Sequence, residues 1–206
     1  MQEVHKRYQG GDPAYEQRLA EAAAIVEEEV ATLRRLVSEF SAFARLPQAS
    51  LERADIGEVL REAARSFPAM LEELSASARV EIVCTEPAEL LLVDTDAMML
   101  KRALDNLVRN AVQALLEDDA RARGRVWVSA QRRGKRVELV VEDDGPGIPE
   151  ADRARVFDPY YTTKDAGTGL GLAIVKKVVL EHHGHIECLA SPRGGARFAI
   201  ELPART

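Results

Sequence analysis

The sequence predicts an α+β fold: a mixed sheet of about five strands, covered on one face by about three helices and preceded by a long heptad helix. Short runs rich in β-branched and apolar residues recur from residue 79 to the C-terminus, as expected of strands. Helix-like stretches interrupt them without the regular alternation of a parallel α/β fold. Near the N-terminus, apolar residues repeat in steps of four and three, which is typical of a heptad seam. We therefore expect two domains, a helical one at 1–47 and a sandwich of sheet and helices at 48–206.

One long helix is predicted from residue 14 to residue 46. Its seam consists of Leu19, Ala23, Val26, Val30, Leu33, Val37, Phe40 and Ala44. The sequence GGDP separates this helix from residues 1–9, and Pro47 ends it. Because such a seam needs a partner helix, we interpret residues 1–47 as the C-terminal part of a helical hairpin whose first helix is mostly missing.

The predicted elements of the second domain follow from composition and periodicity. A helix is predicted at 54–67, with Pro68 ending or kinking it. Two further helices are predicted at 95–116 and 168–182. Strands are predicted at 79–85, 89–94, 125–132, 136–143, 185–190 and 196–202.

Composition excludes several classes of function. Hydrophobic residues make up 46% of the 206 residues, and the net charge is −6 without a block of basic residues, so we expect no nucleic-acid partner. No apolar run approaches the ~20 residues of a membrane span, so we expect no membrane contact by this fragment. A cytoplasmic location is predicted, and membrane anchoring of an intact protein through upstream segments stays open. Cys84 and Cys188 are interpreted as buried thiols, with a disulfide as the alternative.

The helix at 95–116 carries amides on one side. Asn106, Asn110 and Gln113 lie at positions i, i+4 and i+7, which share a helix face. Asparagine is a poor interior helix former, so two of them one turn apart suggest a function. Amide oxygens suit a hard cation such as Mg²⁺, whose remaining ligands are phosphate and water. A solvated helix face is the alternative.

A carboxylate and glycines follow the strand at 136–143. The strand ends in Asp143, and the sequence DDGPG then supplies Gly145 and Gly147. Such an acid can accept a hydrogen bond from an exocyclic amine, while glycine lets a flat ring approach the backbone. A turn without any ligand explains the same residues, so both interpretations stay open.

A phosphate-binding segment is predicted after residue 147. Residues 148–166 have little regular pattern, and long irregular segments in compact domains are often lids. Lys164 suits a phosphate as a point charge. Gly167, Gly169 and Gly171 precede an apolar helical run, and bare N–H groups at a helix start favour an anion. The spacing fits neither a dinucleotide fingerprint, nor a P-loop, nor a protein-kinase signature.

Four stretches, in this order and spacing, resemble the catalytic ATP-binding domain of sensor histidine kinases, which has the Bergerat-type (GHKL) fold. They are LDNLVRNAVQAL, DDGPGIP, VFDPYYTTK and GTGLGLAIVKKVV, which would be the N box, first glycine box, F box and second glycine box. The resemblance extends over about residues 55–203. EFSAFARLP, at the end of the heptad helix, resembles the second helix of the dimerisation and phosphotransfer hairpin, particularly in nitrogen-regulation sensor kinases.

The resemblance implies binding of ATP with Mg²⁺ and transfer of the γ-phosphoryl group to a histidine, for relay to an aspartate of a response-regulator receiver domain. Asn110 would bind Mg²⁺, Asp143 would accept a hydrogen bond from the adenine amino group, and Lys164 would contact the phosphates. The intact protein would form a homodimer through the helical hairpin. The implied ATP site consists of Asn106, Asn110, Gln113, Asp143, Gly145, Gly147, Ile148, Tyr161, Thr163, Lys164, Gly167, Thr168, Gly169, Leu170 and Gly171.

The chain departs from the family pattern at several positions. Asn106 stands where gyrase, heat-shock chaperone and mismatch-repair ATPases carry a glutamate, and an amide cannot act as a general base; this favours phosphoryl transfer over hydrolysis. Tyr160 and Tyr161 replace the more usual phenylalanines of the F box. Ala196 stands where some relatives place a threonine near the adenine.

The phosphoacceptor histidine is not identified in this chain. No stretch resembles the family's H-E-x-x-N-P, and His5 lacks the following acid and proline. We therefore assign no catalytic residue and expect that the fragment alone does not autophosphorylate. A non-catalytic docking module and an anti-sigma-type serine kinase of the same fold are the alternatives. A metal site at His182, His183 and His185 is disfavoured, because no cysteine or carboxylate stands at ligand spacing.

Overall fold

The computed structural model describes residues 17–27, 29–30, 33–34, 48–118, 122–164 and 168–205. The chain divides into two units. One unit is Pro47–Thr163 with Gly169–Thr206, called the sandwich below; the other is Met1–Leu46 with Lys164–Thr168. The predicted boundary at residue 47 stays a prediction for the domains of the intact protein.

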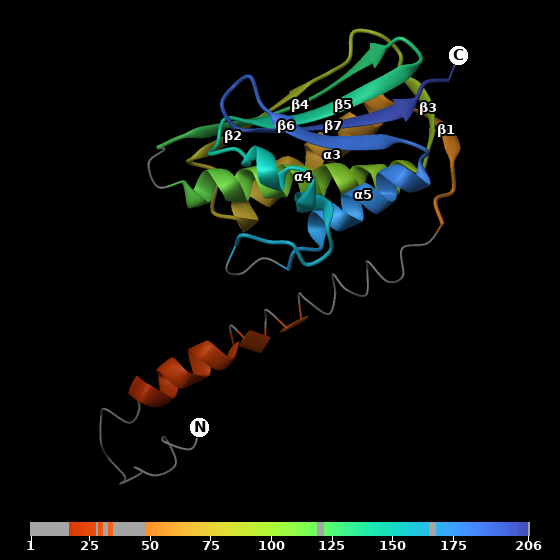
Figure 1. The fold of residues 1–206 in the computed structure, drawn as a ribbon. Helices are drawn as coiled ribbons and strands as arrows, with labels where there is room; N and C mark the ends of the chain where they lie inside the picture. The colour runs from red at the N-terminus through yellow and green to blue at the C-terminus, as the bar shows by residue number, and fades with distance from the viewer. Residues whose placement is uncertain are drawn as a thin grey trace. The chain divides into compact units, whose positions relative to one another are not determined.

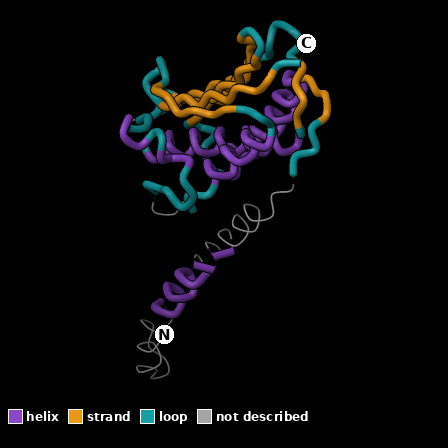
Figure 2. Tube along the Cα trace, turned by 45° about the vertical axis from the view of Figure 1, so that its right-hand side comes forward, coloured by secondary structure: helices purple, strands orange, loops and turns teal. Residues whose placement is uncertain are grey.

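The sandwich contains a five-stranded sheet in the order β2-β4-β5-β7-β6. Strand β2 pairs with β4 in parallel, and the remaining neighbours are antiparallel. The strands are β2 (Val80–Thr85), β4 (Gly124–Arg133), β5 (Arg136–Asp143), β6 (His185–Ala190) and β7 (Ala196–Pro203). Helices α3 (Ile56–Glu73), α4 (Ala97–Glu117) and α5 (Gly171–Glu181) lie together on one face of the sheet (Figures 1 and 2). The predicted α+β fold is therefore confirmed.

A second, two-stranded sheet lies beside the first. It pairs β1 (Glu52–Asp55) with β3 (Leu92–Thr95) in antiparallel register. Strand β3 ends one residue after the strand predicted at 89–94 and begins three residues after its start. Strand β1 was not predicted. Its four residues, Glu-Arg-Ala-Asp, are mostly charged, so neither hydrophobicity nor β-propensity marks them as a strand. They become one because β3 supplies the missing hydrogen bonds.

The core lies between the sheet and the helices. Every second residue of β5 points toward the helices, which buries Val137, Leu139 and Val141 to 1% exposure or less. Helix α4 contributes an apolar stripe of Leu100, Ala103, Leu104, Leu107, Val108, Ala111, Val112 and Leu115, all at most 4% exposed. Because this stripe is buried in the core, the other side of α4, which carries Asn106, Asn110 and Gln113, faces the predicted site.

Helix α3 contradicts one of the two outcomes predicted for Pro68, the end of the helix. The helix does not end there but continues to Glu73. Proline removes one backbone hydrogen bond inside a helix, yet Phe67 and Met70 are 4% and 5% exposed on either side of it. Packing of these side chains outweighs the lost bond, and the ring of Pro68 points to solvent.

We expect Pro68→Ala to raise the free energy of unfolding by about 1 kcal/mol, because alanine restores the hydrogen bond and is the better helix former. Urea denaturation followed by circular dichroism measures this change. Glu72→Ala, at an exposed position of the same helix, is the control and should change stability by less than about 0.5 kcal/mol. A lower stability for Pro68→Ala would contradict this explanation.

Helix α5 begins later than predicted, at Gly171 instead of Thr168. Gly169 has a φ of +66°, which lies outside the helical region, and Leu170 is the N-cap residue. After the C-terminal end of α5, His183 has a left-handed backbone conformation, with a φ of +55°. Two of the three glycines therefore precede the helix, and one is its first residue.

Within Met1–Leu46, the described residues 17–27, 29–30 and 33–34 are helical. Leu19, Val26, Val30 and Leu33 of the predicted seam are between 41% and 58% exposed. The rest of the predicted helix and His5 lie outside the described residues. Among the described residues, no helix is long and apolar enough to span a membrane.

Candidate functional site

The amide side of α4 meets the first residue of α5. A Cβ atom built on Gly171 would lie 3.8 Å from Asn110 Nδ2 and 3.9 Å from Asn106 Oδ1. These are ordinary contact distances, so alanine would fit sterically but would occupy the space in front of both amides. Three of the predicted residues are thus brought together at a helix N-terminus, where backbone N–H groups favour an anion.

Gly169 has a different reason to be glycine. Its φ is positive, and a Cβ there would lie 2.5 Å from the carbonyl carbon of Tyr160 and 2.8 Å from the Tyr161 nitrogen. The Tyr160 N–H also donates to the Gly169 carbonyl oxygen at 3.0 Å. Two backbone segments therefore touch directly at the start of α5, which leaves no room for a side chain.

Asp143 lies at the end of β5 and is 3% exposed. Its Oδ1 atom accepts a hydrogen bond from the Gly145 N–H at 2.9 Å and another from the Ala196 N–H at 3.1 Å. Two backbone donors on one oxygen orient the carboxylate as a hydrogen-bond acceptor. Ala196 makes its hydrogen bond through the backbone N–H group. The absence of the threonine hydroxyl that some relatives have at this position does not affect that bond.

Gly195, which the sequence interpretation missed, packs against Asp143. A Cβ on Gly195 would overlap the Asp143 carboxylate and would lie 2.6 Å from the Gly145 nitrogen. Gly147, at φ +74°, also faces the Gly195 carbonyl, which is 3.3 Å from a Cβ built there. The sequence feature that could have indicated this contact is the pair Gly194-Gly195 before a strand, because glycine beside a strand often marks a close approach of two backbone segments.

The irregular segment after Gly147 is partly anchored. It contains two short 3-10 turns, η1 (Glu150–Asp152) and η2 (Arg155–Phe157). Phe157 is 6% exposed, and its ring meets the Phe198 ring edge-on at a centroid distance of 6.1 Å. Ile148 is half-buried, and its carbonyl oxygen accepts from Arg153 Nε at 3.0 Å. The segment up to Phe157 is therefore tied to the sheet.

The remaining predicted residues are less closely defined. Gln113 and Tyr161 are half-buried, Thr163 is exposed, and Leu170 is 1% exposed. Gly167 lies outside the described residues. Lys164 and Thr168 belong to the other unit, so their roles at the phosphates stay predictions.

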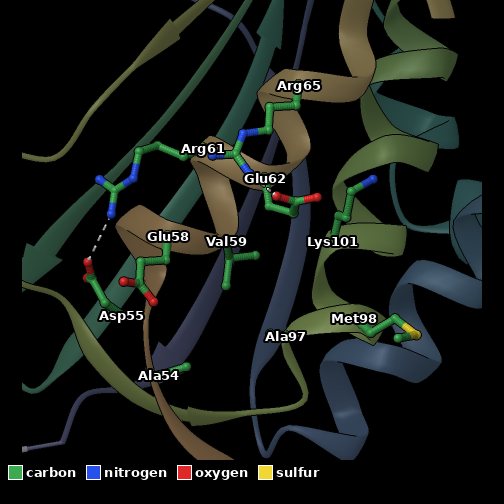
Figure 3. Close-up of a pocket in the computed structure, with 10 residues that line it drawn as sticks. All are labelled: Ala54, Asp55, Glu58, Val59, Arg61, Glu62, Arg65, Ala97, Met98 and Lys101. Atoms are coloured by element: carbon green, nitrogen blue, oxygen red, sulfur yellow. Dashed lines mark hydrogen bonds and ion pairs between the residues drawn. The ribbon is translucent and has the colours of Figure 1, made fainter. Parts of the chain in front are cut away.

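A separate hollow of about 540 Å³ lies between α3 and the start of α4 (Figure 3). Val59 and Ala97 line it, and its charged side chains are largely paired: Arg65 donates to Glu62 at 2.7 Å, and Lys101 to Asp105 at 2.6 Å. Its described lining residues include none of the predicted ATP-site residues, so we treat it as distinct from the candidate site.

His182 has a structural role. It is 1% exposed, its Nε2 accepts from the Asp96 N–H at 2.9 Å, and its Nδ1 lies 2.7 Å from the Val178 carbonyl oxygen. Among the described residues, no group of histidines, cysteines or carboxylates could hold a metal ion. Both cysteines are free, and burial raises the pKa of the Cys188 thiol to about 11, so the thiol form is favoured.

Comparison with known proteins identifies the family. The family described as "Histidine kinase-, DNA gyrase B-, and HSP90-like ATPase" matches residues 95–206. The nitrogen regulation protein NtrY of Azorhizobium caulinodans is 36% identical over 179 residues. This match covers 85% of the present chain but only 22% of NtrY, so the chain spans about a fifth of that relative.

Two solved structures have the same fold. Full-length ShkA in complex with AMPPNP has a TM-score of 0.69 and 28% identity, covering 98% of this chain and 41% of ShkA. The histidine kinase ThkA in complex with the response regulator protein TrrA has a TM-score of 0.68 and 26% identity, covering 95% of this chain and 53% of ThkA. With the match of more than half of its residues, the chain belongs to the histidine kinase-, DNA gyrase B- and HSP90-like ATPase family, and its relatives are sensor histidine kinases.

Proposed function

We propose that this chain is the ATP-binding catalytic part of a sensor histidine kinase. In the intact protein the γ-phosphoryl group of Mg-ATP would pass to a histidine supplied from outside this chain, and then to a receiver-domain aspartate. The observation that carries the proposal is the position of Gly171, whose missing side chain leaves space directly in front of Asn106 and Asn110. A purine with an anionic tail requires a buried, oriented hydrogen-bond acceptor such as Asp143, and a space beside a helix N-terminus such as the one in front of these two amides.

Each end of the site has its own task. Asp143, held by the Gly145 and Ala196 N–H groups, would accept from the adenine amino group and select that base. At the other end, the first N–H groups of α5 would bind phosphate oxygens, and Asn110 would bind Mg²⁺ with Asn106 beside it. Bound Mg²⁺ would neutralise charge on the phosphates, and positioning would supply the remaining catalysis.

Four further points belong to the proposal. A response-regulator receiver domain is the proposed partner, supported by the solved complex of ThkA with TrrA. Homodimerisation through the helical hairpin and a cytoplasmic location of the nucleotide site follow from the proposed family role. Asn106 in place of a glutamate favours phosphoryl transfer over hydrolysis, because an amide does not take a proton from water.

Calorimetric titration with a non-hydrolysable ATP analogue, with and without Mg²⁺, tests the proposal. We expect binding that Mg²⁺ strengthens, and Asp143→Asn should weaken it by about twentyfold, because one carboxylate oxygen becomes an NH₂ group that opposes the adenine amine. Asp144→Asn is the matched control: Asp144 accepts from the Arg125 N–H at 2.7 Å on the neighbouring strand, and its substitution should leave the affinity unchanged.

Absence of binding at millimolar nucleotide would overturn the proposal and favour a docking module. If binding is found, a histidine-bearing hairpin supplied in trans with labelled ATP identifies the acceptor. Phosphate that is lost in acid and retained in base indicates histidine. Acid-stable phosphate on a serine of a partner would instead support the anti-sigma-type kinase.

A further inference from the structure

We propose that Arg193 is a positioning residue for adenine recognition at Asp143. It would act by fixing the turn between β6 and β7, residues 191–195, which brings Gly195 against the Asp143 carboxylate. This inference rests on the proposed nucleotide-binding function for its consequence, whereas the contacts of Arg193 are independent of that function.

The turn reaches both faces of the sheet at the end of β5. Successive residues of a strand point to opposite faces, so Asp143 lies on the helix-covered face together with the buried Val141. Glu142 therefore lies on the outer face, opposite the helices. Gly195 packs against Asp143, whereas the Arg193 side chain approaches Glu142. The turn thus contacts the end of this strand from both sides.

Two contacts hold the Arg193 side chain on the outer face. Its guanidinium carbon lies 4.2 Å from the centre of the Trp127 ring, which is within cation–π range. Its Nε atom lies 3.8 Å from Glu142 Oε2. Trp127 and Glu142 lie directly opposite each other on β4 and β5, so Arg193 contacts both members of a cross-strand pair. Glu142 Oε1 also accepts from Arg197 Nη1 at 2.9 Å, so Glu142 keeps a partner when Arg193 is removed.

Hydrogen bonds within the turn fix its shape. The Ser191 N–H donates to the Gly195 carbonyl at 2.8 Å, and the Gly194 N–H donates to the Ser191 carbonyl at 3.0 Å. The Arg193 N–H donates to Ser191 Oγ at 3.1 Å. Gly194 and Gly195 have no side chains with which to pack on the sheet, so the Arg193 side chain supplies an attachment that they lack.

The orientation of the turn affects Asp143 directly. It sets the position of the Ala196 N–H, which donates to Asp143 Oδ1 at 3.1 Å. Gly195 lies so close to Asp143 that no Cβ fits between them, so a small displacement of the turn changes this contact. A turn released from the outer face would therefore orient the carboxylate less well for the adenine amino group. The space between Gly171 and the amides of α4 is formed by other elements and would not change.

Two nucleotides separate base recognition from phosphate binding. We would measure the affinity for a non-hydrolysable ATP analogue with Mg²⁺ and for its inosine counterpart, in which a carbonyl replaces the amino group, by calorimetry and NMR titration. Arg193→Ala should weaken binding of the adenine nucleotide by about threefold, the effect of losing a partly exposed cation–π contact and ion pair. It should not weaken binding of the inosine nucleotide, so the ratio of the two affinities should fall.

Arg133→Ala is the matched control. Arg133 is also an arginine at the sheet surface, and its Nε lies 2.8 Å from Glu138 Oε2 near the β4–β5 hairpin, at the other end of these strands. Its substitution should leave both affinities unchanged. Arg193→Lys keeps a cation within reach of the Trp127 ring, so its affinity ratio should lie closer to that of the unaltered chain than the ratio of Arg193→Ala. Equal losses for the two nucleotides, or an unchanged ratio in Arg193→Ala, would overturn the proposal.

Fluorescence tests the contact on the outer face. Trp127 is the single tryptophan of the chain, so tryptophan emission reports on this ring alone. Acrylamide should quench this emission more strongly in Arg193→Ala than in the unaltered chain or in Arg133→Ala, because the guanidinium no longer covers the indole. Equal quenching in all three would show that Arg193 does not cover the ring and would overturn the proposal.

The outcome is distinguishable from failure of the proposed function. If the unaltered chain binds neither nucleotide, the proposed function fails, and amide hydrogen exchange tests the positioning of the turn. Exchange of the Ala196 N–H should be faster in Arg193→Ala than in Arg133→Ala, which would support the action of Arg193 on the group that donates to Asp143. Equal exchange in the two variants would overturn it.

Discussion

Gly195→Ala is expected to reduce affinity for the ATP analogue by about a hundredfold, which corresponds to about 3 kcal/mol. The added methyl group would overlap the Asp143 carboxylate and crowd the Gly145 nitrogen. Because Asp143 is 3% exposed and its Oδ1 already accepts from two backbone N–H groups, it cannot move without breaking a hydrogen bond. Isothermal titration calorimetry measures the affinity, and thermal denaturation measures the accompanying stability loss of about 2 kcal/mol.

Gly194→Ala is the matched control for this prediction. Gly194 has a φ of +112°, but a Cβ built there meets no atom within 4 Å. Alanine at this position therefore imposes backbone strain of about 1–2 kcal/mol without overlap, so it should lower stability and leave nucleotide affinity within about threefold. If both variants lost affinity equally, the effect would come from the turn as a whole and not from contact with Asp143.

His182→Ala is expected to lower the free energy of unfolding by about 3 kcal/mol. The ring is 1% exposed and bridges two helices: it accepts from the N–H of Asp96, the N-cap residue of α4, and contacts the Val178 carbonyl of α5. Since Nε2 accepts, Nδ1 carries the proton and donates. Alanine would leave a cavity and the Asp96 N–H without its partner, while the Val178 carbonyl would keep only the backbone N–H of residue 182, at 3.2 Å. Urea denaturation gives the change directly.

The neighbouring histidine provides the control. His185 is exposed on β6, so His185→Ala should change stability by less than about 0.5 kcal/mol. A cost below about 1 kcal/mol for His182→Ala would mean that water or a rearranged chain replaces both hydrogen bonds. That result would remove the reason to regard His182 as a link between the two helices that carry the site.

Local rules predicted most of the elements but not the positions at which several of them end. Pro68 lies inside α3 because burial of Phe67 and Met70 outweighs its lost hydrogen bond. Strand β1 has no hydrophobic pattern and exists because β3 pairs with it. In each case a contact with a distant part of the chain overrides the local preference.

In the candidate site, too, local patterns predicted some features and contacts between distant segments decided the others. Periodicity placed Asn106 and Asn110 on one side of a helix, and the glycine spacing predicted bare N–H groups for an anion at the start of the next helix. Neither pattern could say that Gly169 is needed for contact with Tyr160, whereas Gly171 faces the amides. The contact that orients Asp143 comes from Gly195 and Ala196, which are far from it in sequence.

The sequence by itself determined the α+β class, the order along the chain of the helices and of every strand except β1, and the family resemblance, because periodicity, glycine spacing and amide spacing are properties of short segments. Only the tertiary structure decided which glycine faces Asn106 and Asn110, which backbone groups orient Asp143 and that His182 joins α4 to α5. Those assignments depend on distances between segments that are remote in sequence, and such distances are established only when the sheet and helices pack together.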